Sequence, residues 1–446
     1  MQRVVAARMA KKTYFFLLPV SAAVGNYALL AASKSSGGLS AWRLLVLLGG
    51  CLAVFGLQWV RNRNLRLLPV VLYVWVAWGL LSLLWTPDLK SGSSDVVNMA
   101  LYLLMVLGTL GLRGYEPGNL KALCSGWVAA YLVSGAVASW ELLTNNHLPG
   151  YWIEENPARA LLEFVAISFY SNPNNYGAFI LLSVPFLLLA IGTATGYCKK
   201  AVLYALLLSA PFFILATGCR LALVGFMVQI LTWLLSGKRK ASALLVIVVM
   251  ACLGLVALQG LSARNETKLE KILSLQQKVT GDESFRSRAN LSLNGLTMLF
   301  HSYGMGYGAA SYEKVSASSM LPLRQTSGII NPHNFTIQIL SEYGVIVFAF
   351  FACWIATLLR SSLAAKGAGS VAGSAADLYA QAVVISLVGY LFASVCHSSY
   401  LKEMTHWTFL STLNLIAGYL YYTRREEGGC ALVEEPPLLT NVKAST

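Results

Sequence analysis

Long apolar stretches, each about the length that crosses a lipid bilayer, follow one another along most of the chain. A helix needs about 20 apolar residues to span the hydrocarbon core. These stretches are too long and too uniformly apolar for the alternating strands of a membrane barrel, so they predict helices. We expect about twelve transmembrane helices, at residues 13–33, 41–60, 66–85, 95–112, 120–143, 173–195, 198–216, 218–236, 240–258, 335–360, 377–396 and 405–423.

The pattern therefore predicts an all-α, polytopic integral membrane protein with a single membrane domain, residues 1–423. A polar tail, residues 424–446, has the composition of a disordered segment. One long polar segment, about residues 259–334, separates the ninth and tenth spans. Residues 265–279 and 290–300 within it carry apolar side chains at helical spacing, which predicts amphipathic helices. In the second, the apolar face is expected to hold Leu293, Leu296 and Phe300.

The composition and the distribution of charge further restrict the class of protein. The chain is 57% hydrophobic and only 12% charged, whereas about 25% charged residues are usual in soluble proteins. Of its 33 Lys and Arg residues, 19 fall at the termini or in short loops on one side of the predicted spans, against 6 in short loops on the other side. The positive-inside rule then makes both termini cytoplasmic and places the long segment outside. The net charge of +14 reflects this bias, so no nucleic-acid partner is expected.

The sequence offers no pattern for a metal or another cofactor. None of the eight Cys residues lies in the long outer segment, no two of them form a CxxC motif, and the acidic residues form no DxD motif. The five His residues lack a metal-ligand spacing. We expect neither disulfides nor a bound metal ion.

His333 is the first candidate for chemistry. It stands in the string NPHN, where Pro332 should end any preceding helix and Asn334 or Phe335 should begin the next span. Imidazole is the side chain best suited to exchange protons near neutral pH. The alternative is an interfacial histidine that only hydrogen-bonds to a helix cap.

Three arginines are candidates for binding an anion. Arg220 lies at the predicted outer start of a span, where a charge close to hydrocarbon is costly, about 2.5–3.5 kcal/mol at mid-bilayer. Arg286 and Arg288 open the second amphipathic helix of the long segment. Guanidinium groups bind diphosphates through paired hydrogen bonds. The alternatives are snorkelling of Arg220 to lipid headgroups and ordinary solvated loop charges for the other two.

Two further motifs carry candidate binding residues. Asn172 and Asn174 stand in the string NPNN before a span, where they could cap the helix or bind sugar hydroxyls, and capping is the favoured role. Gly304 and Gly306 mark a turn in which the backbone must bend or approach something closely.

Taken in order, these strings resemble the O-antigen ligase and polymerase-like membrane family. The similar elements are TGCRLALVGF around Arg220, the SR of Ser287 and Arg288 before a G-x-G, and the HN of His333 and Asn334 before an E-x-G, with the NPN from Asn172 as a further match. The resemblance covers about residues 170–345. Cys219 stands where serine is commoner, and Ser292 stands where an aromatic residue is often found.

The resemblance implies a bacterial inner-membrane enzyme that moves a glycan from an undecaprenyl-diphosphate carrier to an acceptor hydroxyl on the outer face. This is a metal-independent, inverting glycosyl transfer without a cofactor. His333 would act on the acceptor as base or orienting group, and Arg220 and Arg288 would bind the diphosphate. Arg286, Asn334, Gly304, Gly306, Asn172 and Asn174 would contribute to substrate binding. The acceptor would be a glycan, a lipid or a wall polymer, and polysaccharide-export proteins are candidate partners.

Two other classes compete with this interpretation. A lipid-linked oligosaccharide flippase would suit the number of spans, although the charges lie mainly in one outer loop and not along the spans. A cell-wall glycan polymerase would rely on an outer acidic residue, for which Asp88 and Asp95 are the candidates. Within the favoured family, the sequence does not separate a polymerase from a ligase, and we favour a polymerase.

Overall fold

The computed structural model describes residues 2–25, 40–54, 63–148, 165–170, 172–236, 282–367, 374–397 and 400–427. Within these ranges the regular structure is helical, and no strand is present. The helices are α1 Gln2–Ala23, α2 Ala41–Val54, α3 Arg63–Ser82, α4 Leu89–Gly111, α5 Pro117–Thr144, α8 Pro173–Thr193, α9 Tyr197–Thr217, α10 Arg220–Ser236, α13 Asp282–His301, α14 Tyr312–Ser316, α15 Phe335–Gly367, α16 Ala375–Cys396 and α17 Met404–Glu427.

The predicted spans agree with this helical structure. Eleven of the twelve overlap a helix of the described residues, the first, 13–33, only over its N-terminal part in α1, and the ninth, 240–258, lies outside them. Seven described helices, α3, α4, α5, α8, α9, α15 and α16, are long and apolar enough to cross a membrane, while α2 and α10 are shorter apolar helices. The chain is therefore a polytopic membrane protein, and the exact number of twelve spans stays a prediction.

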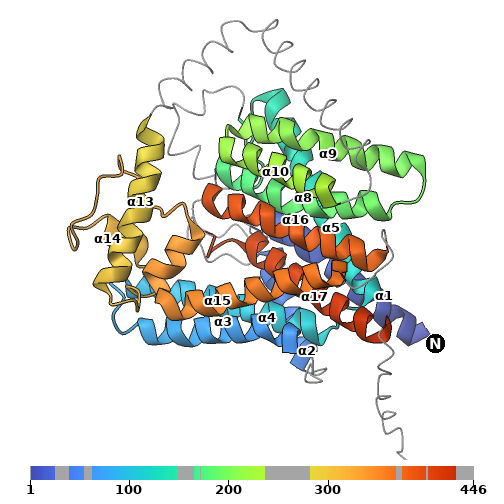
Figure 1. Cartoon of the computed structure of the whole chain (residues 1–446), viewed down its shortest axis with the longest axis horizontal. Coiled ribbons are helices and arrows are strands. Elements are labelled where there is room, and N and C mark those ends of the chain that lie inside the picture. Colours follow the sequence, from blue (N-terminus) through green and yellow to red (C-terminus); the bar gives the residue numbers. More distant parts are fainter. Residues whose placement is uncertain are drawn as a thin grey trace, which may run out of the picture.

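The long helices lie side by side, and α13 stands across one end of the bundle (Figure 1). Helix α8 packs between α9 and α16, and α16 in turn contacts α10, α15 and α17. On the other side of the bundle, α4 contacts α2 and α3, and α3 contacts α15. Since α13 contacts α15, it is fixed over the end of the bundle at which α15 begins.

Aromatic rings and paired polar groups fill the interior around α17. The rings of Tyr102 and Trp407 stack with their centroids 5.0 Å apart. The indole N–H of Trp127 donates to the hydroxyl of Thr412 at 3.0 Å. A polar group inside a membrane domain is costly unless it is hydrogen-bonded, so such pairs allow α17 to be buried despite its Thr and Asn residues.

The long polar segment between the ninth and tenth predicted spans is partly as predicted. The second amphipathic helix is present as α13, which begins earlier than expected, while residues 265–279 lie outside the described residues. On the predicted apolar face of α13, Leu293 and Phe300 are exposed and Leu296 is partly buried, so contact of this face with the membrane stays a prediction. Another face of α13 holds Leu291 and Met298, which pack against Tyr312 and Ile337. Helix α17 continues to Glu427, four residues beyond the predicted end of the last span at 423.

Candidate functional site

The segment that holds the G-x-G motif, Gly304 to Gly306, hydrogen-bonds through its backbone to the E-x-G motif, Glu342 to Gly344. The segment that follows α13 runs along α15, where the backbone amides of Tyr307 and Gly308 donate to the carbonyls of Ser341 and Glu342 at 2.8 and 2.9 Å. The amide of Val345 donates back to the carbonyl of Gly304 at 2.9 Å. These three hydrogen bonds attach the long polar segment to the first turns of α15.

Glycine is required on both sides of this contact. Gly306 has φ +82°, and a Cβ atom there would lie 2.5 Å from the carbonyl oxygen of Glu342. Gly344 has φ +76° within α15, and its Cβ would lie 2.3 Å from the carbonyl oxygen of Gly304. L-residues avoid positive φ, and neither position has room for a side chain. Gly304 and Gly306 thus have a structural role, as the attachment of what we call the lid, residues 282–334.

The docked lid is also held by the buried side chain of Glu342. Its Oε1 accepts the backbone N–H of Tyr312 at 3.1 Å. Next to it, the hydroxyl of Tyr343 donates to the Oδ2 of the buried Asp95 on α4. From the α3–α4 region, Trp85 donates its indole N–H to the carbonyl of Gly306 at 3.0 Å. The lid therefore contacts α15 and the α3–α4 connection, and the Tyr343–Asp95 hydrogen bond joins α15 to α4 beside it.

His333 lies where the lid joins α15. It has φ +46°, a left-handed conformation that is uncommon outside glycine and concentrates at functional sites. Its ring hydrogen-bonds to the backbone of Cys396, and Nδ1 is buried without a hydrogen-bond partner among the described residues. Burial, together with the charges of Arg288 and His397, lowers the pKa of His333 to about 4. The imidazole is therefore neutral at physiological pH and can accept a hydrogen bond.

Arg288 brings positive charge to the same place. It is half-buried on α13, and its charge acts on His333 as well as on the thiols of Cys219 and Cys396. Cys219 and Cys396 are buried neighbours whose side chains contact each other. The structure thus gathers the first turns of α13, the α9–α10 junction, the end of α16 and the start of α15.

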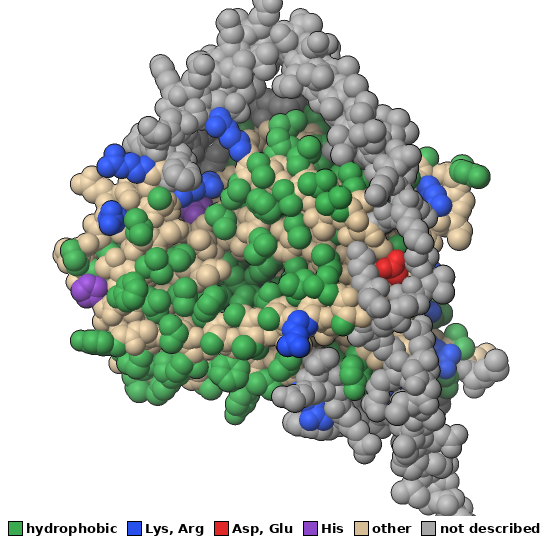
Figure 2. Space-filling model, in the orientation of Figure 1, with side chains coloured by type: hydrophobic (Ala, Val, Ile, Leu, Met, Phe, Trp, Pro, Cys, Tyr) green, Lys and Arg blue, Asp and Glu red, His purple; other side chains and the backbone are tan. Residues whose placement is uncertain are grey.

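Arg220 begins α10 directly after Cys219 and is exposed, as is Arg286 on α13. In the view of Figure 2, Lys and Arg side chains gather near a His at the upper left, in the region of α13 and α10. The charge of Arg288 acts on Cys219, the residue directly before Arg220, so the starts of α10 and α13 lie at the same end of the bundle. A shared role of the two arginines stays a prediction.

The three asparagine candidates lie at helix starts. Asn172 caps α8 by accepting the N–H of Asn175 at 3.0 Å, with Pro173 at the first helical position. Asn334 caps α15 by accepting the N–H of Ile337 at 3.3 Å. Capping, the role favoured from the sequence, is thus confirmed for Asn172, and the sugar-binding role of all three, Asn174 included, stays a prediction.

Sequence reasoning missed two acidic side chains at this end of the bundle. Glu403, just before α17, lies 3.4 Å from Nε2 of His397. Glu141, on the last turns of α5, accepts the backbone N–H groups of Ile167 and Ser168 at 2.9 and 2.8 Å. The signal in the sequence was an acidic residue within about six positions of a His, near the end of a predicted span.

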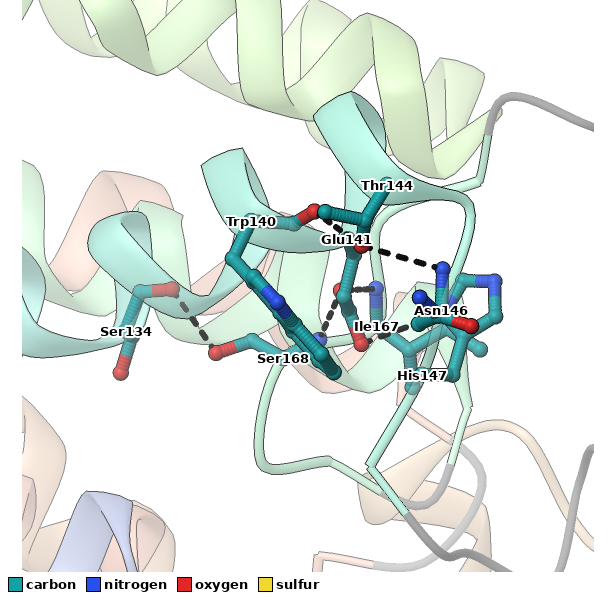
Figure 3. A network of polar contacts seen from close by, with 8 residues as sticks. All are labelled: Ser134, Trp140, Glu141, Thr144, Asn146, His147, Ile167 and Ser168. Atoms are coloured by element: carbon teal, nitrogen blue, oxygen red, sulfur yellow. Dashed lines mark hydrogen bonds and ion pairs between the residues drawn. The ribbon is translucent and has the colours of Figure 1, made fainter.

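Figure 3 shows the second of these networks. His147 lies 3.2 Å from the other carboxylate oxygen of Glu141, and Ser168 donates from its hydroxyl to the carbonyl of Ser134. Ser168 also has a positive φ of 55°. The network holds the short segment 165–168 against α5, and this segment leads to the NPNN motif.

The fold and site define a class: a polytopic helical membrane protein with a docked lid and a cationic, histidine-bearing site at one end. Residues 203–352 match the family model described as O-antigen ligase. The chain is also 23% identical over 413 residues to the teichuronic acid biosynthesis protein TuaE of Bacillus subtilis (strain 168), covering 90% of this chain and 83% of that protein.

These findings confirm the resemblance to an O-antigen ligase-like family. They also support a link to polysaccharide biosynthesis, at the level of the family. The matched range includes Arg220, Arg288 and His333, together with the lid and its attachment to α15. It does not assign a role to any of these residues.

Proposed function

We propose that this protein transfers a glycan from an undecaprenyl-diphosphate carrier to an acceptor hydroxyl on the outer face of the bacterial inner membrane. The family match and a relative named for teichuronic acid biosynthesis support a glycosyl-transfer enzyme. In this proposal the acceptor is a second carrier-linked glycan, which makes the protein a polymerase of an exported polysaccharide.

The observation that carries the proposal is that the charge of Arg288, on the first helix of the lid, acts on His333, at the end of the lid. The buried Nδ1 of this neutral imidazole has no hydrogen-bond partner among the described residues, and the guanidinium is half-buried. An acceptor hydroxyl would donate its proton into a hydrogen bond with that nitrogen, and a diphosphate would pair with the guanidinium. The imidazole would thus bind the attacking hydroxyl, and the guanidinium would bind the leaving diphosphate.

The chemistry follows from these positions. The acceptor oxygen attacks the anomeric carbon, and the bond from that carbon to the diphosphate oxygen breaks. Arg288 and Arg220 neutralise the negative charge that grows on the leaving diphosphate, which is where preorganised cations lower a barrier most. A single displacement inverts the anomeric centre.

Purified protein in lipid nanodiscs, supplied with undecaprenyl-diphosphate-linked glycan, tests the proposal through the release of undecaprenyl diphosphate. Arg220→Ala, Arg288→Ala and His333→Ala should each lower the rate by about 10²–10³. Arg324→Ala and His301→Ala are matched controls, because both side chains are exposed on the lid, and they should stay within about twofold. Full activity of Arg288→Ala and His333→Ala would refute the site.

The acid-dependent alternative is tested in the same assay. Asp88 caps α4 through the N–H and hydroxyl of Ser91, at 3.1 and 2.9 Å, and Asp95 accepts the hydroxyl of Tyr343. Both acids thus have structural partners. Asp88→Ala should retain transfer, and loss of transfer only in Asp88→Ala would favour the cell-wall polymerase class. Movement of intact carrier-linked glycan without diphosphate release would favour a flippase.

A further inference from the structure

The end of the lid helix α13 carries large apolar side chains that the described residues leave uncovered. Phe300, Tyr303 and Met305 are 74%, 95% and 49% exposed. They belong to one short segment, residues 300–305, which we call the lid tip. Elsewhere on the lid, exposed side chains such as those of Arg324 and Gln325 are polar. The lid tip is therefore an apolar surface that needs a partner other than water.

Tyr303 occupies a backbone position that usually belongs to glycine. It has φ +51° directly after α13, and its N–H donates to the carbonyl of Phe300 at 3.0 Å. The next N–H, that of Gly304, donates to the carbonyl of Leu299 at 2.9 Å, which closes the end of the helix. Glycine adopts this conformation without strain, whereas tyrosine does not. A tyrosine that is strained here and yet fully exposed indicates a use for its ring.

The lid tip lies at the point where α15 becomes able to cross a membrane. Gly344 interrupts α15 with φ +76°, so the continuous helix begins at Val345. From Val345 to Ala365, about 21 residues at 1.5 Å each span about 31 Å, and the hydrocarbon core is about 30 Å thick. The N–H of Val345 donates to the carbonyl of Gly304 at 2.9 Å. This contact therefore places the lid tip at the edge of the hydrocarbon.

Helix α3 places the same edge beside the lid tip. Its apolar span ends at Ser82. The indole N–H of Trp78 donates to the carbonyl of Met305 at 3.4 Å. The indole N–H of Trp85 donates to the carbonyl of Gly306 at 3.0 Å. Tryptophan is enriched at membrane–water interfaces, where its ring is in an apolar environment and its N–H has a partner.

The apolar surface of the lid tip continues the exposed apolar surfaces of α3 and α15. Leu80 and Leu81 are exposed on α3, and Val345 and Ile346 are exposed on α15. In the view of Figure 2, green hydrophobic side chains cover the flank formed by these helices up to the end of α13. Residues 291–312 contain no Asp, Glu, Lys or Arg. The lid tip thus extends the surface that the spanning helices present to lipid, without a charge to exclude it from the membrane.

We propose that the lid tip inserts into the membrane interface on the side of the lid, so that the lid is anchored in lipid as well as on α15. Phe300 and Met305 contact the upper parts of the acyl chains, and the ring of Tyr303 lies at the level of the headgroups, with its hydroxyl towards water. The partner of this surface is the lipid bilayer itself. The anchor does not depend on the glycosyl transfer proposed above.

Fluorine NMR tests where the lid tip lies. Trifluoromethyl-phenylalanine replaces Tyr303 in one sample and Gln325, an exposed polar residue of the same lid, in a second sample. Both full-length proteins are placed in phosphatidylcholine nanodiscs. Phosphatidylcholine with a spin label near the top of its acyl chain should broaden the resonance at position 303 more than that at 325. A water-soluble gadolinium chelate should have the reverse order of effects.

Two results of this experiment would overturn the anchor. A resonance at position 303 that responds to the chelate as strongly as that at 325, without broadening by the labelled lipid, would place the lid tip in water. A resonance at 303 that neither probe broadens would mean that protein, such as a second copy of this chain, covers the lid tip.

Hydrogen exchange in the same nanodiscs then measures what the ring of Tyr303 contributes. Tyr303 and Ala310 both have left-handed backbones, with φ +51° and +53°, so Tyr303→Gly and Ala310→Gly relieve similar strain. Only Tyr303→Gly removes an anchoring side chain. Amides of residues 304–309 should exchange about tenfold or more faster in Tyr303→Gly than in Ala310→Gly. Equal exchange in the two variants, or slower exchange in Tyr303→Gly, would overturn the anchor.

Discussion

The attachment of the lid to α15 predicts a sharp difference between two glycine substitutions. Gly306 and Gly328 both have φ +82°, so Gly306→Ala and Gly328→Ala carry the same backbone cost, about 1–2 kcal/mol. Nothing lies within 4 Å of a Cβ at Gly328, whereas a Cβ at Gly306 meets backbone atoms of Glu342 and Gly344 at 2.5–2.7 Å. Backbone atoms cannot swing aside, so Gly306→Ala must separate the lid from α15.

The magnitude follows from the hydrogen bonds that are lost. Three backbone hydrogen bonds of 2.8–2.9 Å cross this contact. At about 1 kcal/mol each, their loss weakens the attachment by about 3 kcal/mol beyond the backbone cost. This corresponds to about a hundredfold increase in the population of the open lid.

Hydrogen exchange of the protein in nanodiscs measures this population directly. Amides of residues 303–311 should exchange about a hundredfold faster in Gly306→Ala than in Gly328→Ala, while those of α8 and α16 stay unchanged in both. Gly304→Ala, whose Cβ would meet only Val345 side-chain atoms at 3.6 Å, should behave like Gly328→Ala. Equal exchange in Gly306→Ala and Gly328→Ala would refute the docking argument.

Five other predictions concern these residues and the proposed transfer. Glu141→Gln weakens the hold on two backbone N–H groups and should lower the stability by about 1–3 kcal/mol in thermal unfolding; an unchanged midpoint would contradict this. Tyr343→Phe removes the donor from buried Asp95 and should cost a similar amount in the same assay. Because native His333 stays neutral down to about pH 4 while its ordinary pKa is 6.5, its contribution to stability should fall as the pH drops from about 6.5 to 4. Arg288→Ala should raise the pKa of His333 in a histidine NMR titration, and no shift would show that the two groups lie too far apart. A chelator should leave transfer unaffected, as the metal-independent mechanism predicts.

The sequence by itself determined the membrane class of the protein and the positions of most helices. Runs of about 20 apolar residues allow little besides spanning helices, because a backbone in hydrocarbon must satisfy its own hydrogen bonds. The order of motifs around Arg220, Arg288 and His333 was also readable, and the family match over residues 203–352 agrees with it.

The tertiary structure alone decided how these motifs are used. The apolar periodicity of α13 was compatible with more than one face, and contact with Tyr312 and Ile337 selected the face with Leu291 and Met298. The G-x-G and E-x-G motifs are separate elements in the sequence, whereas in the structure their backbones hydrogen-bond to each other. His397 and Glu403 lie far along the chain from His333, and no local pattern records which ends of distant helices meet. Such contacts depend on helix packing, whose energy is spread over many side chains, so a single sequence does not show them.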